Sequence, residues 1–403
     1  MSTSSPRHVL VAGAGIGGLT LACALRRVGL SVTVFERADS LKWVGAGLTV
    51  QMNASAALRR IGLCDEVAQA GACPTDSAIL RPSGSALTRL PVTRIQEELG
   101  LPLVCVHRAR LQSVLLAHAG EENVRLGLTV TAFHDDGQTV TVRLSDGSSV
   151  TGDALVGADG LRSVVRGALL GDAPLRYSGY TSWRGVCPDV PSATPGLVSE
   201  TWGPGARFGV VPIGFGQTYW FATRNAPAGG QDAPGETRAR LRSIFGGWHA
   251  PIADLIAATD EANILRTDIH DRPPASRWSR GRVTLLGDAA HPMTPNLGQG
   301  GCQAIEDAVV LAECLAGEGP VDAALAAYEQ CRLERANSFV TRSWSLGRVG
   351  QWENSAGRFL RDALFQLVPQ GLAARQVREQ VRDAASRGPI QAAPQRTAHP
   401  AKP

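Results

Sequence analysis

The sequence is almost without lysine: only Lys42 and Lys402 occur among its 403 residues, although 40 residues are lysine or arginine. Arginine therefore carries nearly all the positive charge, and it is interspersed with aspartate and glutamate instead of forming blocks. The formal net charge is only +4. A nucleic-acid-binding surface needs a basic cluster, so we expect no nucleic-acid partner.

Long apolar runs are also missing, and none approaches the roughly 20 residues that a membrane-spanning helix needs. The polar residues 1–8 lead directly into a predicted strand, so we expect no signal peptide. The eight cysteines form no C-x-x-C pair, and several lie in apolar helical patterns, where cysteine acts as a small hydrophobe. We therefore expect a reduced cytoplasmic protein with no metal site and no membrane span.

Sequence patterns divide the chain into two kinds of region. Residues 9–35 favour a strand, a glycine turn, a helix and a second strand, and α/β patterns return after residue 103. There we predict a helix over 108–119, a strand over 124–130 and a hairpin with strands 139–144 and 149–151.

A different pattern occupies residues 177–271, where short alternating stretches are separated by glycine and proline. It indicates an antiparallel sheet with one helix near 237–245. We expect the segment 77–101 to join this sheet. Helices dominate from 303 to about 386, and 388–403 is rich in proline, alanine and glutamine.

The clearest motif is the glycine turn Gly13-Ala-Gly15-Ile-Gly-Gly18, which follows a strand and begins a helix. Glycine is needed there for a tight turn, for contact between backbone and pyrophosphate, and for close helix–strand packing. Phosphates then bind the free N–H groups at the positive end of the helix. Glu36 ends the second strand, where a carboxylate can hold ribose hydroxyls. The motif predicts a dinucleotide but does not choose between NAD and FAD.

Two further strand ends carry carboxylates. Asp159 follows a short apolar strand and precedes a helix expected near Arg162, at the edge where α/β sheets bind ligands. Asp288 ends another buried strand, and the turn Gly298–Gly301 precedes a helix expected from Cys302. N–H groups at that turn can approach a flavin ring and stabilise the negative charge of its reduced form.

In their order and spacing, these three motifs resemble the class A FAD-dependent aromatic monooxygenases of the para-hydroxybenzoate hydroxylase type. The stretches Tyr177–Gly185 and Leu297–Asp307 are similar to the branch with zeaxanthin epoxidase, salicylate hydroxylase and urate hydroxylase. The resemblance covers about residues 9–382. One departure is Gln51-Met-Asn53, because relatives usually have proline before the asparagine.

The resemblance implies an α/β fold, in which a Rossmann-like FAD-binding domain carries an inserted antiparallel-sheet substrate domain and C-terminal helices. We expect the FAD-binding domain to be discontinuous. The boundaries are 1–76, 102–176 and 272–345 for that domain, 77–101 and 177–271 for the substrate domain, 346–387 for the C-terminal helices and 388–403 for a disordered tail.

The resemblance also implies the cofactor and its ligands. FAD is expected to bind tightly without a covalent bond, and NADPH or NADH to act as a transient reductant, since the chain has only one G-x-G-x-x-G. The implied FAD-binding residues are Gly13, Gly15, Gly18, Glu36, Arg37, Gly47, Arg108, Asp159, Asp288, Gly298, Gly300 and Gly301.

The implied reaction is hydroxylation or epoxidation of a small aromatic, heteroaromatic or conjugated substrate by dioxygen, through a flavin C4a-hydroperoxide. Arg207 and Tyr219, on two predicted adjacent strands, match positions that face the substrate in the urate-hydroxylating relative. A surface arginine and a core tyrosine are the plain alternative. His291 has no partner at metal-ligand spacing and is interpreted as structural.

Other functions stay open at this stage. A flavin-dependent halogenase would need a W-x-W-x-I-P segment and a catalytic lysine, and an oxidase or a non-catalytic flavin-binding module is a further alternative. The sequence does not separate a monomer from a homodimer. The amphipathic stretch Arg358–Leu367 is expected to pack on the protein body and not on a membrane.

Overall fold

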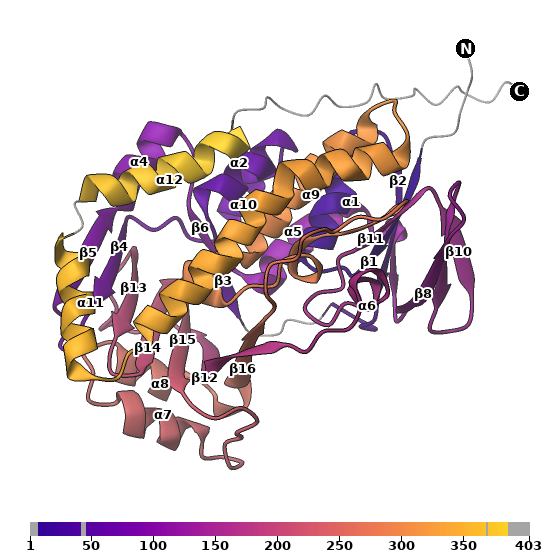
Figure 1. The fold of residues 1–403 in the computed structure, drawn as a ribbon. Coiled ribbons are helices and arrows are strands. Elements are labelled where there is room, and N and C mark those ends of the chain that lie inside the picture. The colour runs from indigo at the N-terminus through magenta and orange to yellow at the C-terminus, as the bar shows by residue number, and fades with distance from the viewer. Residues whose placement is uncertain (1–6, 42–45, 368–369, 386–403) are drawn as a thin grey trace, which may run out of the picture.

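The computed structural model describes residues 7–41, 46–367 and 370–385 (Figure 1). Its central layer is a five-stranded sheet in the order β17-β11-β1-β2-β7, in which all neighbours run parallel. The strands are β1 His8–Ala12, β2 Ser31–Glu36, β7 Val124–Leu126, β11 Ala154–Gly157 and β17 Val283–Leu285. Because β1 is the middle strand, the glycine turn after it opens at the centre of the carboxyl edge.

The helix α1, Ile16–Arg27, follows this turn and is buried from Ile16 to Leu25. A helix that is apolar all round must be enclosed, and α1 packs against two others. These are α5 Arg108–Ala119 and α9 Gly300–Ala316. The long helix α10, Val321–Gly350, lies over α9 and runs from the parallel sheet to the second sheet (Figure 1).

The second sheet has seven strands in the order β16-β12-β15-β14-β13-β4-β5. Its strands are β4 Asp76–Leu80, β5 Ala86–Pro91, β12 Arg176–Pro188, β13 Leu197–Trp202, β14 Ala206–Pro212, β15 Gln217–Asn225 and β16 Leu265–Asp271. β4 and β5 thus bring a segment from the first quarter of the chain into the sheet that residues 176–271 form. The sheet is not wholly antiparallel, however, because β4 pairs with β13 in parallel.

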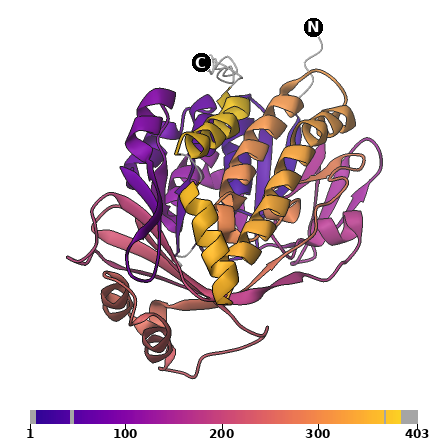
Figure 2. The same cartoon turned by 60° about the vertical axis from the view of Figure 1, so that its left-hand side comes forward.

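The two faces of this sheet have different partners. On one face Trp183, Phe208 and Trp220 form an apolar core with α7 Thr237–Phe245 and α8 Ile252–Ala258. Both helices lie on the side of the sheet away from the parallel sheet (Figure 2). The prediction of α7 is confirmed, whereas α8 was missed because seven residues are too few to show a helical period. The other face is turned toward the parallel sheet.

Local details correct several predictions. The strand expected over 124–130 ends at Leu126, since Gly127 takes a φ of +72° and the chain re-forms as β8, Val130–Asp135. β8 pairs with β9, Val140–Leu144. β9 and β10, Ser149–Gly152, form the predicted hairpin, which is thereby confirmed.

Two helix starts also differ from the prediction. The helix α6, Val164–Leu170, begins two residues after Arg162, because Ser163 caps it by accepting a hydrogen bond from the Arg166 N–H. The helix α9 begins at Gly300, two residues before the expected start.

The remaining elements connect the two sheets and cover one end. They are β3 Gly47–Val50, β6 Val104–His107, α2 Met52–Arg60, α3 Cys64–Gln69, α4 Val92–Leu99, α11 Ser355–Leu367 and α12 Gln370–Ala385. Both α11 and α12 pack against the edge strand β5, and α12 also packs on α2. The tail 388–403 lies outside the described residues. Among the described residues, no helix is long and apolar enough to cross a bilayer.

Candidate active site

The turn after β1 shows why each glycine is needed. Gly13 has a φ of +104°, and a Cβ there would lie 2.5 Å from the Ala158 carbonyl oxygen. A Cβ on Gly18 would lie 2.0 Å from the Gly13 carbonyl oxygen, so this glycine lets α1 touch the turn. Gly15, by contrast, has no atom within 4 Å of its Cβ position. It faces open space at the N-terminus of α1, where a phosphate binds most favourably.

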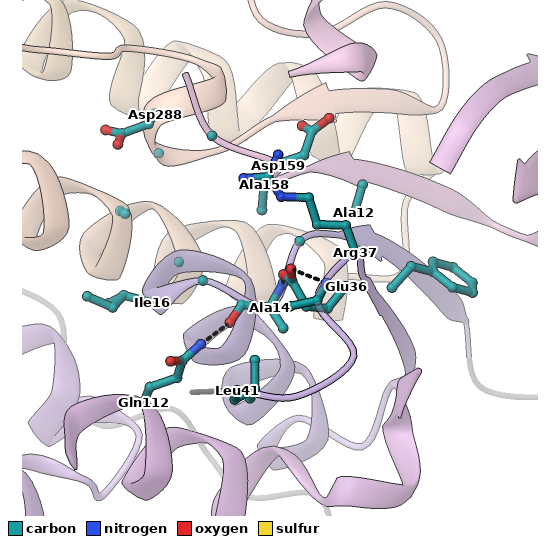
Figure 3. A pocket seen from close by; sticks show the side chains of 18 of the residues that line it. Ala12, Ala14, Ile16, Glu36, Arg37, Leu41, Gln112, Ala158, Asp159 and Asp288 are labelled. Atoms are coloured by element: carbon teal, nitrogen blue, oxygen red, sulfur yellow. Dashed lines mark hydrogen bonds between the residues drawn. The ribbon is translucent and has the colours of Figure 1, made fainter. Parts of the chain in front are cut away.

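Two side chains hold the backbone of this turn. Glu36, at the end of β2, accepts hydrogen bonds from the N–H groups of Ala14 at 2.8 Å and Ala38 at 3.0 Å. On the other side the Gln112 side chain donates to the Ala14 carbonyl oxygen at 2.8 Å (Figure 3). The turn is therefore held in place from β2 and from α5.

Asp159 follows β11, and only one of its two carboxylate oxygens accepts hydrogen bonds from the described residues. Its Oδ2 accepts from the N–H groups of Val164 at 2.8 Å and Val165 at 3.4 Å, at the start of α6. Its Oδ1 is buried and receives no hydrogen bond from the described residues. Burial raises the pKa of Asp159, with Ser163 opposing the shift. A buried acceptor without a donor is costly, so a ligand hydroxyl or N–H fits here.

The third turn presents Asp288 to the same space. Its carboxylate is open to the cavity, although protein walls surround it and raise its pKa by desolvation. His291 and Arg108 oppose that shift. Arg166, whose pKa burial lowers to about 10, donates to the carbonyl oxygens of Ala289 and Ala290 and so fixes the turn.

One elongated cavity of about 800 Å³ connects these turns. Glu36 and Arg37 line it beside the glycine turn, and Asp288 lines it farther along the carboxyl edge (Figure 3). The structure brings nine of the predicted cofactor residues to its walls: Gly13, Gly15, Glu36, Arg37, Arg108, Asp159, Asp288, Gly300 and Gly301. Their individual roles as FAD ligands stay predictions.

The other three predicted cofactor residues lie outside the wall. Gly18 packs on the turn, as described above. Gly47 pairs with His107 between β3 and β6, and a Cβ there would lie 2.5 Å from the Tyr219 ring. Gly298 takes a φ of +63° in the turn before α9, next to the side chain of Gln51. Glycine is thus needed at Gly18 and Gly47 for close contact with a neighbouring backbone and ring, and at Gly298 for its positive φ.

The departure at Gln51 has a structural counterpart. Its side-chain N–H donates to the Leu297 carbonyl oxygen at 2.7 Å, and its oxygen accepts from the Gln299 side chain at 2.7 Å. Two side-chain hydrogen bonds thus hold α2 against the turn that precedes α9.

A buried ionic cluster lies beneath the third turn. Asp307 accepts from the Gly287 N–H at 3.1 Å and from Arg332 Nε at 2.8 Å, and His291 Nε2 is 2.5 Å from it. Glu306 receives Arg332 Nη1 at 2.5 Å. Burial opposes ionisation of Asp307, but His291 and Arg332 outweigh it and lower the pKa. His291 therefore has a structural partner, in line with its interpretation, and no metal-binding group is found among the described residues.

Arg207 and Tyr219 lie on the face of the second sheet that α7 and α8 do not cover, and neither residue lines the cavity. In the β14–β15 register Arg207 pairs with Thr223 and Val211 with Tyr219, so both predicted substrate residues share a face. Arg207 is 2% exposed and donates to Glu200 at 3.0 Å and to Gln351 at 3.2 Å, and its third nitrogen donates to Asn296. Arg207 is therefore a buried crosslink between β14 and the turn that contains Asn296. The alternative of a surface arginine is wrong.

The structure also identifies residues that the motifs did not. Gln112 lies one helical turn after Arg108, so i, i+4 spacing placed both on one face of α5. Asn296 lies in a 3-10 turn, Pro295–Leu297, and receives hydrogen bonds from Arg207 and from Tyr180 at 3.0 Å. No local pattern predicts these partners, because they come from strands about 90 and 116 residues away.

The cavity has the features that an extended dinucleotide with a flavin ring requires. It offers helix N-termini at Gly15 and Gly300, an unpaired buried acceptor on Asp159 and an open carboxylate on Asp288. Together with the second sheet, these features define a flavoprotein of the FAD-dependent hydroxylase class.

The chain belongs to the FAD binding domain family, whose model matches residues 7–343. Aurachin C monooxygenase/isomerase of Stigmatella aurantiaca is 54% identical over 360 residues, which cover 89% of this chain and 94% of that protein. The chloroplastic zeaxanthin epoxidase of Solanum lycopersicum is 45% identical over 317 residues, 75% of this chain. The match covers 47% of that epoxidase, so this chain spans about half its length.

A solved structure extends the similarity to the fold. Klebsiella pneumoniae HpxO, crystallised with FAD and uric acid, matches with a TM-score of 0.88 and 33% identity over 94% of this chain and 97% of that chain. The chain is thus an FAD-dependent monooxygenase, and the use of NAD(P)H and dioxygen is typical of its family. The class A hypothesis is confirmed and replaces the halogenase, oxidase and non-catalytic alternatives.

Proposed function

We propose that this monooxygenase inserts one oxygen atom from dioxygen into an apolar conjugated or heteroaromatic substrate, with NADPH or NADH as transient reductant. The observation that carries the proposal is an apolar cluster on the face of the second sheet that carries Tyr219, where Val211, Tyr219 and Phe221 pack with Val186 and Val198. Such a surface suits a planar conjugated molecule better than a charged one. The relative at 54% identity is named an aurachin C monooxygenase/isomerase, so aurachin C is the first compound to test.

When bound, FAD supplies the redox chemistry that activates dioxygen. The chain's own groups then position and shield the reaction. N–H groups at the start of α9, near Gly300, stabilise negative charge at that end of the cavity. The apolar face around Tyr219 excludes water.

Tyr219 is suited to donate a hydrogen bond. Burial raises the pKa of this phenol and Arg184 opposes the shift, so the hydroxyl stays neutral at pH 7. Its ring touches β3 at Gly47, and the Ala46 carbonyl oxygen on that side accepts from the Arg108 N–H at 2.9 Å. Tyr219 is thereby linked to a wall of the cavity, and we assign it to substrate orientation.

We assign Arg207 to positioning of the turn that contains Asn296. Arg207→Ala is expected to raise KM about tenfold or more, because a charged hydrogen bond contributes roughly 1.5–3 kcal/mol. Bound FAD per chain should change little, since Arg207 does not line the cavity. Steady-state kinetics and the flavin spectrum of the same preparation check both points, and Arg207→Lys, which keeps the charge, serves as the control. Unchanged KM and kcat would remove Arg207 from this role.

Asp288→Ala is expected to weaken FAD binding by roughly 1–3 kcal/mol, because a hydroxyl of the cofactor loses its acceptor. Asp288→Asn keeps an acceptor oxygen and should lose less. Titration of each apoprotein with FAD, followed by fluorescence quenching, measures the difference. Equal affinity for the wild type and the alanine variant would contradict the role of Asp288.

The proposed reaction is tested by following NAD(P)H oxidation with and without aurachin C or another conjugated compound. We expect the compound to accelerate oxidation and to gain one oxygen atom by mass spectrometry, labelled when ¹⁸O₂ is used. Oxidation that yields only hydrogen peroxide with every compound would contradict oxygen insertion.

Three coarser features complete the proposal. The two large sheets support the expected division into an FAD-binding and a substrate domain. A reducing cytoplasm is supported by cysteines such as Cys23, Cys64 and Cys105, which are buried as small apolar side chains in the core. Both a monomer and a homodimer agree with a cavity that one chain lines by itself.

A further inference from the structure

A group of side-chain amides lies between α2 and α9, two helices that pack on each other (Figure 1). Gln51 and Gln299 are the N-cap residues of these helices, and Asn53 and Gln303 lie in their first turns. Gln51 is half-buried, and the other three are at most 1% exposed. A buried amide is costly unless its N–H and C=O groups are paired, so the hydrogen bonds of this group show how each amide is oriented.

Gln299 is the centre of this group. Its side-chain nitrogen donates to the side-chain oxygens of Gln51 at 2.7 Å and Asn53 at 3.2 Å. Its side-chain oxygen accepts from Asn53 at 3.0 Å and from Gln303 at 2.9 Å. Gln51 in turn donates to the Leu297 carbonyl oxygen at 2.7 Å. The Gln299 amide thus uses its full hydrogen-bonding capacity, and reversing it would bring donor against donor and acceptor against acceptor.

The carboxylate of Glu306 sets the direction of these bonds. Glu306 is 3% exposed and accepts from the side-chain nitrogens of Asn53 at 2.6 Å and Gln303 at 3.3 Å. Burial opposes its ionisation, but two neighbouring arginines outweigh burial and lower its pKa, so the group is ionised at pH 7. An ionised carboxylate can only accept hydrogen bonds. It therefore fixes which end of the Asn53 and Gln303 amides faces it, and these two fix the amide of Gln299.

This relay of hydrogen bonds ends at the turn that lines the cavity. The Leu297 carbonyl belongs to the rigid peptide plane that leads into Gly298, whose φ is +63°. Gly300 and Gly301 follow and line the cavity. Their N–H groups have no acceptor within the helix, because they lie in the first turn of α9. The direction of these N–H groups therefore depends on the carbonyl that Gln51 holds.

We propose that Gln51 and Gln299 are positioning residues for the flavin. The relay holds the N–H groups of Gly300 and Gly301 toward the cavity, where they favour the reduced, negatively charged flavin. This inference rests on the proposed role of the start of α9 in stabilising negative charge. Neither amide lines the cavity, so each acts through the turn. Loss of either amide should lower the reduction potential of bound FAD while one FAD per chain is retained, since the glycine turn after β1 is untouched.

The test measures the two-electron reduction potential of the full chain loaded with FAD, by anaerobic equilibration with a redox dye. Gln51→Met and Gln299→Met each remove the amide and keep a side chain of similar length. Each should reduce the equilibrium constant for flavin reduction at least about tenfold, which is about 30 mV for a two-electron couple. The double variant should lower the potential no further than Gln299→Met, because one relay is broken only once. No organic substrate is present, so a chain that failed to insert oxygen would still give this result.

Gln96→Met is the matched control. Gln96 lies in α4, is half-buried, donates to the Pro74 carbonyl oxygen at 3.0 Å and accepts from the Leu103 N–H at 2.8 Å, so it makes bonds of the same kind away from the turn. This variant should keep the wild-type potential while losing about as much thermal stability as Gln51→Met. Unchanged potentials in both relay variants overturn the proposal, as does an equal shift in Gln96→Met or an additive shift in the double variant. Should Gln299→Met not fold, Gln51→Met, whose side chain is only half-buried, decides alone.

Discussion

Asp307→Asn is expected to lower the free energy of unfolding by about 3–5 kcal/mol, the largest stability effect that we predict for a single substitution. Asp307 neutralises Arg332 and receives His291 in a cluster without solvent access. Removing its charge leaves a buried guanidinium with one acidic partner, Glu306. Urea denaturation of the FAD-free protein measures the change without the contribution of ligand binding.

The effect should also depend on pH. The pKa of Asp307 is lower in the folded protein than its usual value near 3.9, so its ionised form stabilises the fold above about pH 4. This stabilisation is lost as the pH falls through the folded-state pKa. The difference between wild type and Asp307→Asn should therefore narrow under acid. Glu318→Gln, a substitution at an exposed site beyond α9, is the control for charge loss. A difference that stays constant, or that is below about 1 kcal/mol, would contradict the importance of this cluster.

Gly15→Ala is expected to weaken FAD binding at least about a hundredfold while leaving the apoprotein as stable as the wild type. The backbone at Gly15 is compatible with alanine, and nothing lies within 4 Å of the added Cβ, so the fold has room for the methyl group. The methyl group would instead occupy the space in which a pyrophosphate must contact the start of α1. Binding of the cofactor is lost, but the structure is retained.

Gly13→Ala provides the contrasting case. Its Cβ would meet backbone atoms of Ala158 at 2.5 and 2.8 Å, and its φ of +104° is unfavourable for alanine. We therefore expect loss of stability together with loss of FAD. Thermal melting of both apoproteins and FAD titration separate a structural glycine from one that contacts the ligand. Normal FAD affinity in Gly15→Ala would show that the phosphates bind elsewhere.

Sequence patterns predicted the elements that carry strong local signals. The strands on either side of α1, the helix Arg108–Ala119 and the hairpin β9–β10 agree closely with the structure. Each has a clear period or a turn whose residues are fixed by backbone conformation. The elements that were missed or misplaced have weaker signals: α8 is short, and β7 ends at Leu126, before Gly127, a break that an apolar pattern alone does not reveal.

The candidate site divides in the same way. Residues within motifs, such as Gly15, Asp159 and Asp288, were predicted because chemistry and spacing occur together in a short stretch. The roles of Asn296, Arg207 and Gln51 depend on contacts between segments far apart in the chain, and these require the tertiary fold. Likewise, the sequence showed that 358–367 is amphipathic, but only the structure shows that Arg361 is buried while Phe359 and Leu364 are exposed.

The central claim is that three turns at one edge of the parallel sheet hold a single FAD molecule. The most direct test is the visible spectrum of the purified chain, followed by release and quantification of its flavin. We predict a yellow protein that releases one FAD per chain on denaturation and binds it again on reconstitution. A colourless chain that takes up no FAD after prolonged incubation would contradict the account.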